Sequence, residues 1–471
     1  MSNWAGKHVA VVGLGISNMP LIDYLVKQGA SISVRDRKSE VELGDRAKLL
    51  HGLGVDCRMG PDYLSGLEQY DAVFLTPGIP KHLPEIQALV GQVPVLSEIA
   101  LVFALAKAPI YGITGSSGKT TVTTLVGEML KASGVKCHVG GNIGVPLIGE
   151  IEQIPEDEPI VLELSSFQLE LLNQSPHGAL VTNISENHLD VHLSMESYIQ
   201  AKKQIYLHQT PEDVALFNYD DPVTRCMAQE AKGQVFFFSR KARVNPGIFL
   251  DGQRLVFQDR AGIVPLIAKQ DIGLIGEHNM ENVMAAALLA YCAGGSWQGI
   301  CQAASGFKGV AHRLEHIAAV NQVDYYNDSI ATSPARAVAG INSFGGRPLI
   351  LIAGGYDKKL GFAEFAKVVS QKVKALILLG QTAGQIEAAV REASPHYHHI
   401  YRAGDLEQAV AVAAQMAVAG DVVLLSPACA SFDMYPGFEA RGEHFRRLVQ
   451  GLASSVNSSN QINGGMISGK D

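Results

Sequence analysis

The segment Gly112-Ile-Thr-Gly-Ser-Ser-Gly-Lys-Thr-Thr121 constrains the fold more than any other part of this chain. An apolar run, Pro109 to Tyr111, precedes it, and an amphipathic run, Val122 to Leu130, follows it. This order predicts a glycine-rich loop between a buried strand and the start of a helix. Backbone N–H groups and the positive end of the helix dipole form a phosphate site at such a junction. The segment therefore predicts a strand–loop–helix unit that binds nucleotide phosphates.

Two side chains of this loop have chemistry that suits a nucleotide. Lys119 can reach the outer phosphates, and the Thr120 hydroxyl can ligate Mg²⁺. The match to G-x-x-x-x-G-K-[ST] is partial because Ile113 replaces its first glycine. A plain turn is the alternative, but the strand in front and Lys-Thr-Thr at the helix start favour phosphate. The residues expected around the phosphates are Gly115, Ser116, Ser117, Gly118, Lys119, Thr120 and Thr121.

The length and the alternation of elements predict the domain organisation. At 471 residues the chain is too long for one core, and about 150 residues per domain gives about three domains. Strand-like and helix-like runs alternate throughout, which favours mostly parallel sheets flanked by helices. We expect an α/β protein with a Rossmann-like domain over 1–107, a central P-loop-type ATPase domain over 108–309 and a Rossmann-like domain over 310–455. Residues 456–471 are rich in Ser, Asn and Gly and are expected to form a disordered tail.

The first block has the pattern of a βαβ unit. A strand, His8 to Val12, leads into Gly13-Leu-Gly15, and a second strand ends near Asp36, about 20 positions after the glycines. Asn18 stands where the dinucleotide fingerprint has its third glycine, so we interpret this block as a platform for a nucleotide or UDP-sugar. A further strand ends in the turn Thr76-Pro-Gly78, where open α/β sheets place their ligands.

Composition argues against several classes of protein. The net charge of −8 is unfavourable for a general nucleic-acid or membrane-surface binder. The six cysteines show no zinc-like spacing and are expected to be reduced thiols. The N-terminus lacks the apolar core of a signal peptide, and the longest apolar run, 283–293, is too short to cross a bilayer. We therefore expect a cytoplasmic protein without membrane insertion.

Other polar residues lie where a strand's own packing does not require them. Glu163 stands in an apolar run, and burying a carboxylate is costly unless it is paired or bound to a metal. His188 follows another predicted strand, and the H-x-D-x-H pattern from His188 to His192 offers a metallohydrolase site as an alternative. Further His and Asp partners at matching spacing are missing, which disfavours that alternative. Spacing alone does not distinguish Lys202 or Lys203 from solvated lysines.

Taken in order, these motifs resemble those of the Mur ligase family. The segments that carry the resemblance are TGSSGKTT, GGNIGVP, LELSSFQLE, TNISENHLD, AKKQIY, GEHNMEN, AHRLE, NDSIATSP, SPACASFD and FEARG. With the opening glycine turn, they extend from Gly13 to Arg441 and cover nearly the whole chain apart from the tail. LELSSFQLE and SPACASFD point to the family member that adds D-glutamate.

The resemblance implies an activity and its cofactors. We expect ATP-dependent addition of D-glutamate to UDP-N-acetylmuramoyl-L-alanine through an acyl phosphate, as a step of cytoplasmic peptidoglycan precursor synthesis. It implies two Mg²⁺ ions and a carbamate, derived from CO₂, on Lys202. We also expect a monomer with small-molecule partners only. The first domain would bind the UDP end of the substrate, the central domain ATP, and the third domain the amino acid.

The resemblance also assigns roles to individual residues. The UDP end would be bound by Ile16, Ser17, Asp36, Arg37, Thr76 and Gly78. ATP would contact Asn279, Asn282, Arg313 and Asp328 in addition to the phosphate loop. The metal ligands would be Thr120, Glu163, His188 and carbamylated Lys202, with Lys119, His188 and Lys202 as the catalytic group. Asn142 would contact the muramoyl substrate, and Thr332, Lys358, Ser431 and Phe438 would hold D-glutamate. Ile330 departs from the family pattern, since many members carry a lysine there.

Four alternatives remain open from the sequence. A folylpolyglutamate synthase-like ligase shares the phosphate loop, and another Mur ligase step shares most motifs. A nicotinamide-dependent oxidoreductase would use the first block, although Asn18 disfavours it. A non-catalytic nucleotide switch would hydrolyse ATP without depending on any amino acid. Phosphate release measured with each candidate amino acid distinguishes them.

Overall fold

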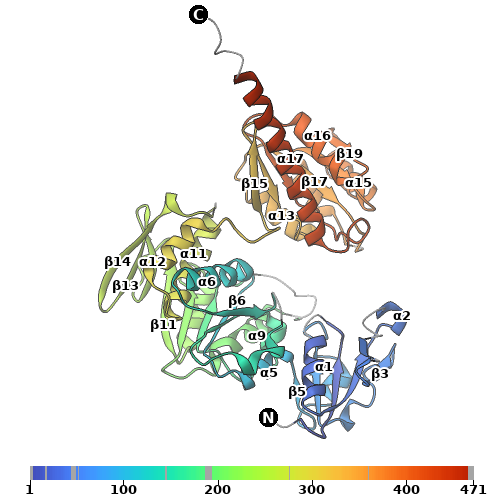
Figure 1. The fold of residues 1–471 in the computed structure, drawn as a ribbon, viewed down its shortest axis with the longest axis vertical. Helices are drawn as coiled ribbons and strands as arrows, with labels where there is room; N and C mark the ends of the chain where they lie inside the picture. Colours follow the sequence, from blue (N-terminus) through green and yellow to red (C-terminus); the bar gives the residue numbers. More distant parts are fainter. Residues whose placement is uncertain are drawn as a thin grey trace, which may run out of the picture. The chain divides into compact units, whose positions relative to one another are not determined.

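The structure is a computed structural model. It describes residues 4–464 except 16–17, 44–48, 51, 144–145, 186–191, 193, 275 and 359, and omits the side chains of 278 and 455–464. The chain divides into two compact units, Met1–Phe307 and Lys308–Asp471, and each is described by itself. The described residues form three sheets, two in the first unit and one in the second (Figure 1).

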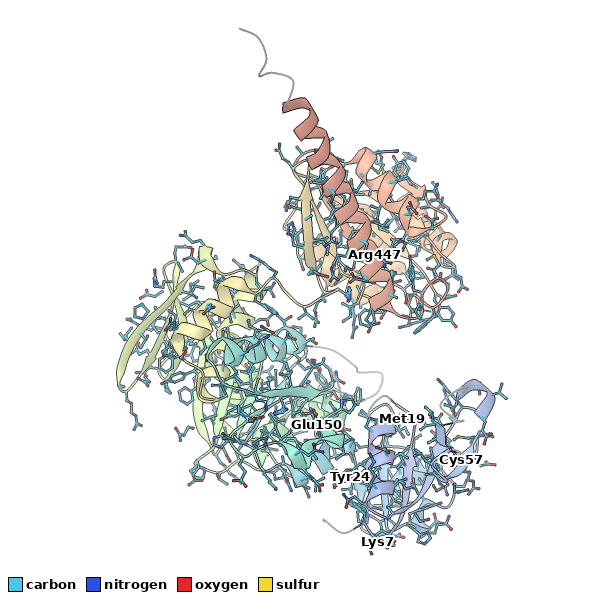
Figure 2. The ribbon with its side chains drawn as sticks, viewed as in Figure 1. Lys7, Met19, Tyr24, Cys57, Glu150 and Arg447 are labelled. Carbon is cyan, nitrogen blue, oxygen red and sulfur yellow. The ribbon has the colours of Figure 1, made fainter. Side chains whose placement is uncertain are left out.

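The N-terminal sheet is fully parallel, with strand order β3-β2-β1-β4-β5. Its strands are β1 (His8–Val12), β2 (Ser31–Asp36), β3 (Asp56–Met59), β4 (Ala72–Leu75) and β5 (Val95–Leu96). The helix α1 (Asn18–Lys27) follows β1, as the βαβ pattern predicts. It packs against the short helix η2 (Leu147–Gly149) of the central part. The Tyr24 hydroxyl on α1, labelled in Figure 2, donates to Glu152 Oε1 at 3.0 Å.

The central sheet has the order β14-β13-β12-β11-β10-β9-β6-β8-β7. The parallel strands are β6 (Ile110–Thr114), β7 (His138–Gly141), β8 (Ile160–Glu163), β9 (Gly178–Val181), β10 (Val214–Asn218), β11 (Gln234–Ser239) and β12 (Gly247–Asp251). The sheet ends in an antiparallel meander of β12, β13 (Arg254–Asp259) and β14 (Gly262–Ala268). The sequence did not predict strands β11 to β14, since strands joined without helices lack the alternation on which the prediction rested.

Helices cover both faces of the central sheet (Figure 1). On one face α6 (Lys119–Ala132), α11 (Glu277–Cys292) and α12 (Trp297–Gly306) pack together over Tyr111 and Ile113 of β6. On the other face, Ile110 of β6 joins a core that includes residues of α5 (Glu98–Leu105) and α9 (Met195–Leu207). Every residue of β6 is buried, so the loop that follows it is mounted on the centre of the domain.

The second unit contains a sheet of order β15-β16-β20-β17-β18-β19. Its strands are β15 (Glu315–Val320), β16 (Val323–Asn327), β17 (Leu349–Gly354), β18 (Val373–Leu379), β19 (Ile400–Arg402) and β20 (Val422–Leu425). All neighbours are parallel except the hairpin of β15 and β16. The helices are α13 (Pro334–Asn342), α14 (Ala363–Lys372), α15 (Ala383–Ala393), α16 (Leu406–Met416) and α17 (Phe438–Gly464).

Two further features bear on the sequence predictions. The helix α17 runs to Gly464 and so enters the segment 456–471, which was predicted to be a disordered tail; residues 465–471 lie outside the described part. In the described part of the chain, none of the helices has the length and apolar character that crossing a bilayer requires.

Candidate active site

The phosphate loop, residues 115–118, depends on two glycines in conformations that other residues avoid. Gly115 has φ 146° and Gly118 has φ 82°, values that favour glycine because it has no Cβ. A Cβ on Gly115 would collide with the Thr182 hydroxyl, and a Cβ on Gly118 would collide with the Asn282 amide oxygen. Gly118 is also the N-cap of α6. The glycines therefore let two neighbouring segments approach the loop closely.

The segment after β9 holds this loop in place. The N–H of Ser116 donates to the Asn183 carbonyl at 2.9 Å, and the N–H of Ser117 donates to Asn183 Oδ1 at 3.0 Å. Thr182 Oγ1 donates to the Ser117 carbonyl at 2.7 Å. The first turn of α6, which contains Thr120 and Thr121, presents N–H groups that a helix cannot pair internally. The loop and helix start thus have the form of a phosphate site.

Lys119 lies over this loop rather than pointing away from it. It is the first residue of α6, and its Nζ donates to the Gly115 carbonyl at 2.9 Å. Its ammonium is therefore already close to the backbone that would surround the phosphates. This position agrees with the phosphate-contacting role predicted for Lys119, although the role itself remains a prediction.

Lys202 and Lys203 have different surroundings. Lys202 is 1% exposed, and its Nζ donates to the Gly115 carbonyl at 2.9 Å and to Thr114 Oγ1 at 3.2 Å. Burial lowers the pKa of Lys202 well below its ordinary value, the charge of Lys119 lowers it further, and Glu163 acts in the opposite direction. Lys203 instead forms an ion pair with Glu230 at 2.6 Å. Lys202 is thus set apart as a buried amine that is easily deprotonated.

Glu163 has the properties of a metal ligand. It ends β8, is 2% exposed, and accepts a hydrogen bond from Asn142 Nδ2 through Oε1 at 2.9 Å. Its other oxygen, Oε2, is buried and has no hydrogen-bond partner among the described residues. An unpaired buried carboxylate oxygen is costly, and oxygen is the ligand that Mg²⁺ prefers. Glu163 therefore fits the role of a Mg²⁺ ligand at the carboxyl end of β8, next to the strand that leads into the loop.

Three predicted residues lie outside the described part of the chain: Ile16, Ser17 and His188. Within the described part, the side chains of His, Cys, Asp and Glu do not converge in any group of three that could hold a metal.

The start of α11 brings two predicted ATP contacts to the loop. Asn282 is 7% exposed, and its Nδ2 donates to Asn279 Oδ1 at 3.1 Å. Asn282 also packs directly against Gly118. Both amides thus lie at the loop, although they are more than 150 residues from it in the sequence.

In the N-terminal sheet, predicted substrate contacts gather at the carboxyl ends of the strands. Asp36 ends β2 and accepts the N–H of Leu14 at 2.8 Å and the N–H of Lys38 at 2.9 Å. The Asn18 side chain, which replaces the third glycine, donates to the Gly13 carbonyl at 2.7 Å and closes the turn after β1. Thr76 follows β4 at the same edge, and the neighbouring predicted residues Arg37 and Gly78 are exposed.

In the second unit, Asp328 is a buried carboxyl at the carboxyl end of β16. It accepts the N–H of Leu314 at 3.2 Å and the Ser426 hydroxyl at 2.8 Å. Burial raises the pKa of Asp328 to about 7, and these hydrogen bonds act in the opposite direction. Arg313, also predicted to contact ATP, immediately precedes Leu314. The predicted ATP contacts are therefore divided between the two units.

The residues predicted to bind D-glutamate lie around the carboxyl ends of β16, β20 and β17, which are adjacent strands. The N–H of Tyr356 donates to the Ala430 carbonyl at 2.9 Å, so the turn that carries Lys358 runs beside Ser431. Ser431 is 1% exposed, Lys358 is exposed, and Thr332 and Phe438 are half-buried. Partial desolvation of the Lys358 side chain and the charge of Arg336 lower the pKa of Lys358.

Two residues at these sites were missed by the sequence reasoning. The ring of Tyr198 lies 4.7 Å from Lys202 Nζ, and its hydroxyl is 3.1 Å from Ser116 Oγ. The four-residue spacing of Tyr198 and Lys202 on one helix was an available signal. Arg441 is 1% exposed, and its guanidinium donates to the hydroxyl and carbonyl of Ser329 and to the carbonyls of Cys429 and Ala430. It thereby joins the turn after β16 to the turn after β20.

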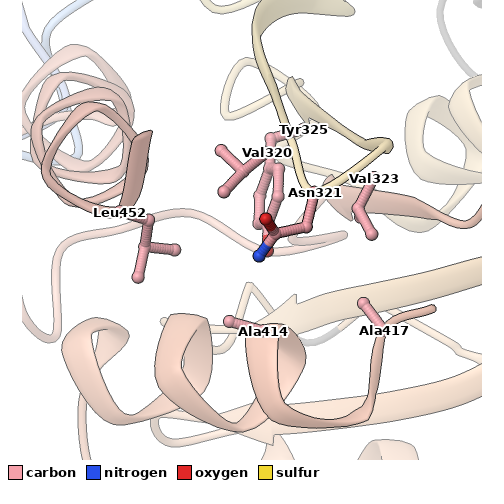
Figure 3. Close-up of a pocket in the computed structure, with 7 residues that line it drawn as sticks. All are labelled: Val320, Asn321, Val323, Tyr325, Ala414, Ala417 and Leu452. Carbon is pink, nitrogen blue, oxygen red and sulfur yellow. The ribbon is translucent and has the colours of Figure 1, made fainter. Parts of the chain in front are cut away.

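A hollow elsewhere in the second unit does not belong to these sites (Figure 3). It has a volume of about 100 Å³. Its lining residues are Val320, Asn321, Val323, Tyr325, Ala414, Ala417 and Leu452. Asn321 and Val323 lie at the amino end of β16, whereas Asp328 lies beyond its carboxyl end. The hollow therefore contains none of the predicted site residues.

Comparisons with known proteins give one family along the chain. Family models match for a "Mur ligase MurD-like, N-terminal domain" over 7–96, a "Mur ligase middle domain" over 113–290 and a "Mur ligase, glutamate ligase domain" over 312–429. The chain is 49% identical over 452 residues to the UDP-N-acetylmuramoylalanine–D-glutamate ligase of Symbiobacterium thermophilum, covering 95% of this chain and 98% of that protein. It is 45% identical over 453 residues to the ligase of that name from Acetivibrio thermocellus, covering 95% and 97%.

Solved structures show the same fold. The UDP-N-acetylmuramate–alanine ligase of Thermotoga maritima matches with a TM-score of 0.55 and 18% identity over 94% of this chain and 99% of that chain. A pseudomurein peptide ligase type C from Methanothermus fervidus matches with a TM-score of 0.53 and 19% identity over 95% and 100%. These structural similarities confirm the three-domain α/β architecture.

Proposed function

This chain belongs to the Mur ligase family, and we propose that it joins D-glutamate to UDP-N-acetylmuramoyl-L-alanine at the expense of ATP. It is an ATP-dependent ligase of peptidoglycan precursor synthesis. A carboxylate is a poor electrophile, so the L-alanyl carboxylate is first phosphorylated by ATP. The D-glutamate amine then attacks the acyl phosphate, and phosphate leaves as the amide bond forms.

The phosphate loop and α6 would bind and orient ATP. The N–H groups at the start of α6 would bind phosphate oxygens, and Lys119 would shift from the Gly115 carbonyl to the transferring phosphoryl group. Phosphoryl transfer depends mainly on positioning and charge stabilisation, which a pre-formed loop and a lysine supply. Asn279 and Asn282 would hold the nucleoside end from α11, and Arg313 and Asp328 would complete the nucleotide contacts.

Thr120 and Glu163 would hold one Mg²⁺ ion at this loop, and His188 with a carbamylated Lys202 would hold a second. Mg²⁺, when bound, neutralises charge on the phosphoryl group that is transferred. We propose that Lys202 is carbamylated, because an ammonium cannot ligate a cation whereas a carbamate offers anionic oxygen. The buried, readily deprotonated amine is the species that reacts with CO₂. Tyr198 would hold Lys202 beside the loop.

The remaining assignments follow the two other sheets. Asp36, Arg37, Thr76 and Gly78, with Ile16 and Ser17, would bind the UDP end, and Asn142 the muramoyl part. Thr332, Lys358, Ser431 and Phe438 would bind D-glutamate, with Arg441 holding the turn that carries Ser431. We retain 1–107, 108–309 and 310–455 as the proposed domain limits. We further propose that the protein acts as a monomer in the cytoplasm.

The observation that carries this proposal is the pair of lysines, Lys119 and Lys202, that both donate to the Gly115 carbonyl beside an unpaired Glu163 oxygen. Phosphate release is measured with ATP, Mg²⁺, UDP-N-acetylmuramoyl-L-alanine and one amino acid at a time. We expect release with D-glutamate and at most about one hundredth of it with L-glutamate, since mispairing one carboxylate with Lys358 and Ser431 costs about 3 kcal/mol.

Lys119→Ala is the negative control and should reduce release by about 10²–10³-fold. Equal release with both enantiomers contradicts the assigned substrate. Release that requires no amino acid indicates a nucleotide switch, and release with a folate substrate indicates the folylpolyglutamate-type alternative.

A further inference from the structure

Polar groups follow one edge of the central sheet beyond the phosphate loop. Strands β6, β9, β10 and β11 are adjacent and parallel, so their carboxyl ends meet at one edge. The loop follows β6, Thr182 follows β9, Asn218 ends β10 and Arg240 follows β11. Each of these strands therefore contributes a polar group to the same edge.

Hydrogen bonds connect these groups into a continuous chain. Thr182 Oγ1 donates to the Ser117 carbonyl at 2.7 Å. Asn218 Nδ2 donates to the Thr182 carbonyl at 3.2 Å and to Glu281 Oε2 at 3.3 Å. Arg240 Nε donates to Glu281 Oε1 at 2.7 Å. The chain thus runs from the phosphate loop to α11, which carries Glu281.

Glu281 directly precedes Asn282, the residue that packs on Gly118 of the loop. The side chain of Asn282 is also held by Asn279, because Asn282 Nδ2 donates to Asn279 Oδ1 at 3.1 Å. Adjacent residues of α11 are therefore attached to the phosphate loop at two points, one through direct packing and one through the hydrogen-bonded chain. Any shift of α11 along the edge would disturb both attachments.

Arg240 is itself fixed in place. The backbone N–H of Arg240 donates to Asp220 Oδ2 at 2.7 Å, and the Ser239 hydroxyl donates to Asp220 Oδ1 at 2.5 Å. The side chains of Arg240 and Glu281 are 20% and 22% exposed. The same guanidinium also contacts Glu277 at 2.9 Å, but that side chain is 76% exposed. Arg240 therefore pairs with one shielded and one solvated carboxylate.

We propose that Arg240 and Glu281 are a positioning pair for ATP. They hold the first turns of α11 so that Asn279 and Asn282 face a nucleotide bound at the phosphate loop. The proposal rests on the proposed function, in which those two amides contact ATP. An exposed ion pair contributes little, whereas a shielded, charge-assisted pair within a connected network holds its partners more firmly.

The test is ATP binding by Glu281→Gln in the full chain, measured by calorimetry with ATP and Mg²⁺ alone. The substitution keeps the shape of the side chain but removes the charge that Arg240 and Asn218 share. We expect the Kd and KM for ATP to rise about tenfold. The KM values for D-glutamate and the UDP substrate should stay within about twofold, and the Tm close to that of the original protein.

Glu277→Gln is the matched control, because it removes the other carboxylate of the same guanidinium. It should change the Kd for ATP by less than about twofold. Arg240→Lys, which keeps the charge with fewer donors, should fall between the original protein and Arg240→Ala.

Unchanged ATP binding in Glu281→Gln overturns the proposal. So does an equal loss in Glu277→Gln, or a uniform loss for all substrates with a lowered Tm. Because the binding assay needs no turnover, weakened ATP binding in a protein that does not ligate D-glutamate would reject the proposed function while supporting the positioning pair.

Discussion

Lys202 in the first unit and Arg441 in the second are long cationic side chains buried beside predicted sites, and they differ in what they contact. Lys202 donates to one hydroxyl and one carbonyl, and burial lowers its pKa well below the ordinary value. Arg441 donates to three carbonyls and a hydroxyl, and burial lowers its pKa only to about 10. A lysine can lose its proton at accessible pH, whereas an arginine keeps its charge and its planar set of donors. The first site thus contains a buried amine with a lowered pKa, and the second contains a guanidinium that holds two turns together.

The largest expected effect comes from removing the buried amine of Lys202. Lys202→Ala should lower ligation by about 10²-fold or more, because a proposed metal ligand is lost. Short carboxylic acids added to the assay should restore part of the activity by supplying an oxygen ligand. Initial rates of phosphate release measure both effects.

The neighbouring lysine is the control for this comparison. Lys203→Ala should stay near the original rate, since Lys203 pairs with Glu230 rather than with the loop. If Lys203→Ala is inactive and Lys202→Ala is active, the metal site has been assigned to the wrong lysine. If neither change matters, both lysines are structural.

An intermediate effect is expected when Arg441, the buried arginine of the second unit, is replaced by lysine. Arg441→Lys cannot supply all the hydrogen bonds of the guanidinium, so buried carbonyls after β16 and β20 lose donors. The free energy of unfolding should fall by about 2–4 kcal/mol, and the KM for D-glutamate should rise more than the KM for ATP. Calorimetry and steady-state kinetics measure these changes. A fully stable, fully active Arg441→Lys would contradict the distinction between the two cations.

The smallest expected effect concerns the buried carboxyl group of Asp328 in the second unit, and it depends on pH. Burial raises the pKa of Asp328 to about 7, against about 3.9 in an unfolded chain. The folded state therefore binds more protons than the unfolded state between these values, and stability contributed by this group falls as the pH rises from about 4 to 7.

Asp328→Asn should remove this pH dependence, because an amide can still accept from the Leu314 N–H and bond to Ser426. The stability advantage of the variant over the original protein should grow by about 1–3 kcal/mol from pH 5 to pH 8. Melting temperatures of both proteins at the two pH values measure the difference. A difference that does not change with pH would show that Asp328 is ionised throughout.

The sequence predicted those parts of the fold that depend on local pattern. The first strand has the predicted bounds, His8–Val12, and the second strand ends at Asp36 as predicted, because continuous apolar runs between turn residues are local signals. Strands β11 to β14 were missed, since they lack the helices that make alternation visible.

The site was predictable only where a motif carries its own chemistry. The phosphate loop and Glu163 could be found from the residues, because a glycine-rich loop and a carboxylate in an apolar run are unusual in themselves. Arg240 gave no such signal. Its contact with Glu281, 41 residues away, depends on the order of strands in the sheet, which single-residue patterns do not encode.

The hydrogen bonds that Thr182 and Asn183 make with the phosphate loop have a consequence for the association of a nucleotide. These side chains and carbonyls hold Ser116 and Ser117 through hydrogen bonds made within the chain itself. Binding therefore needs to order little backbone, and the conformational entropy that a floppy loop would lose on binding is lost during folding instead. Nucleotide association at this loop should accordingly be fast and limited by diffusion and orientation, with little contribution from a slow rearrangement of the chain.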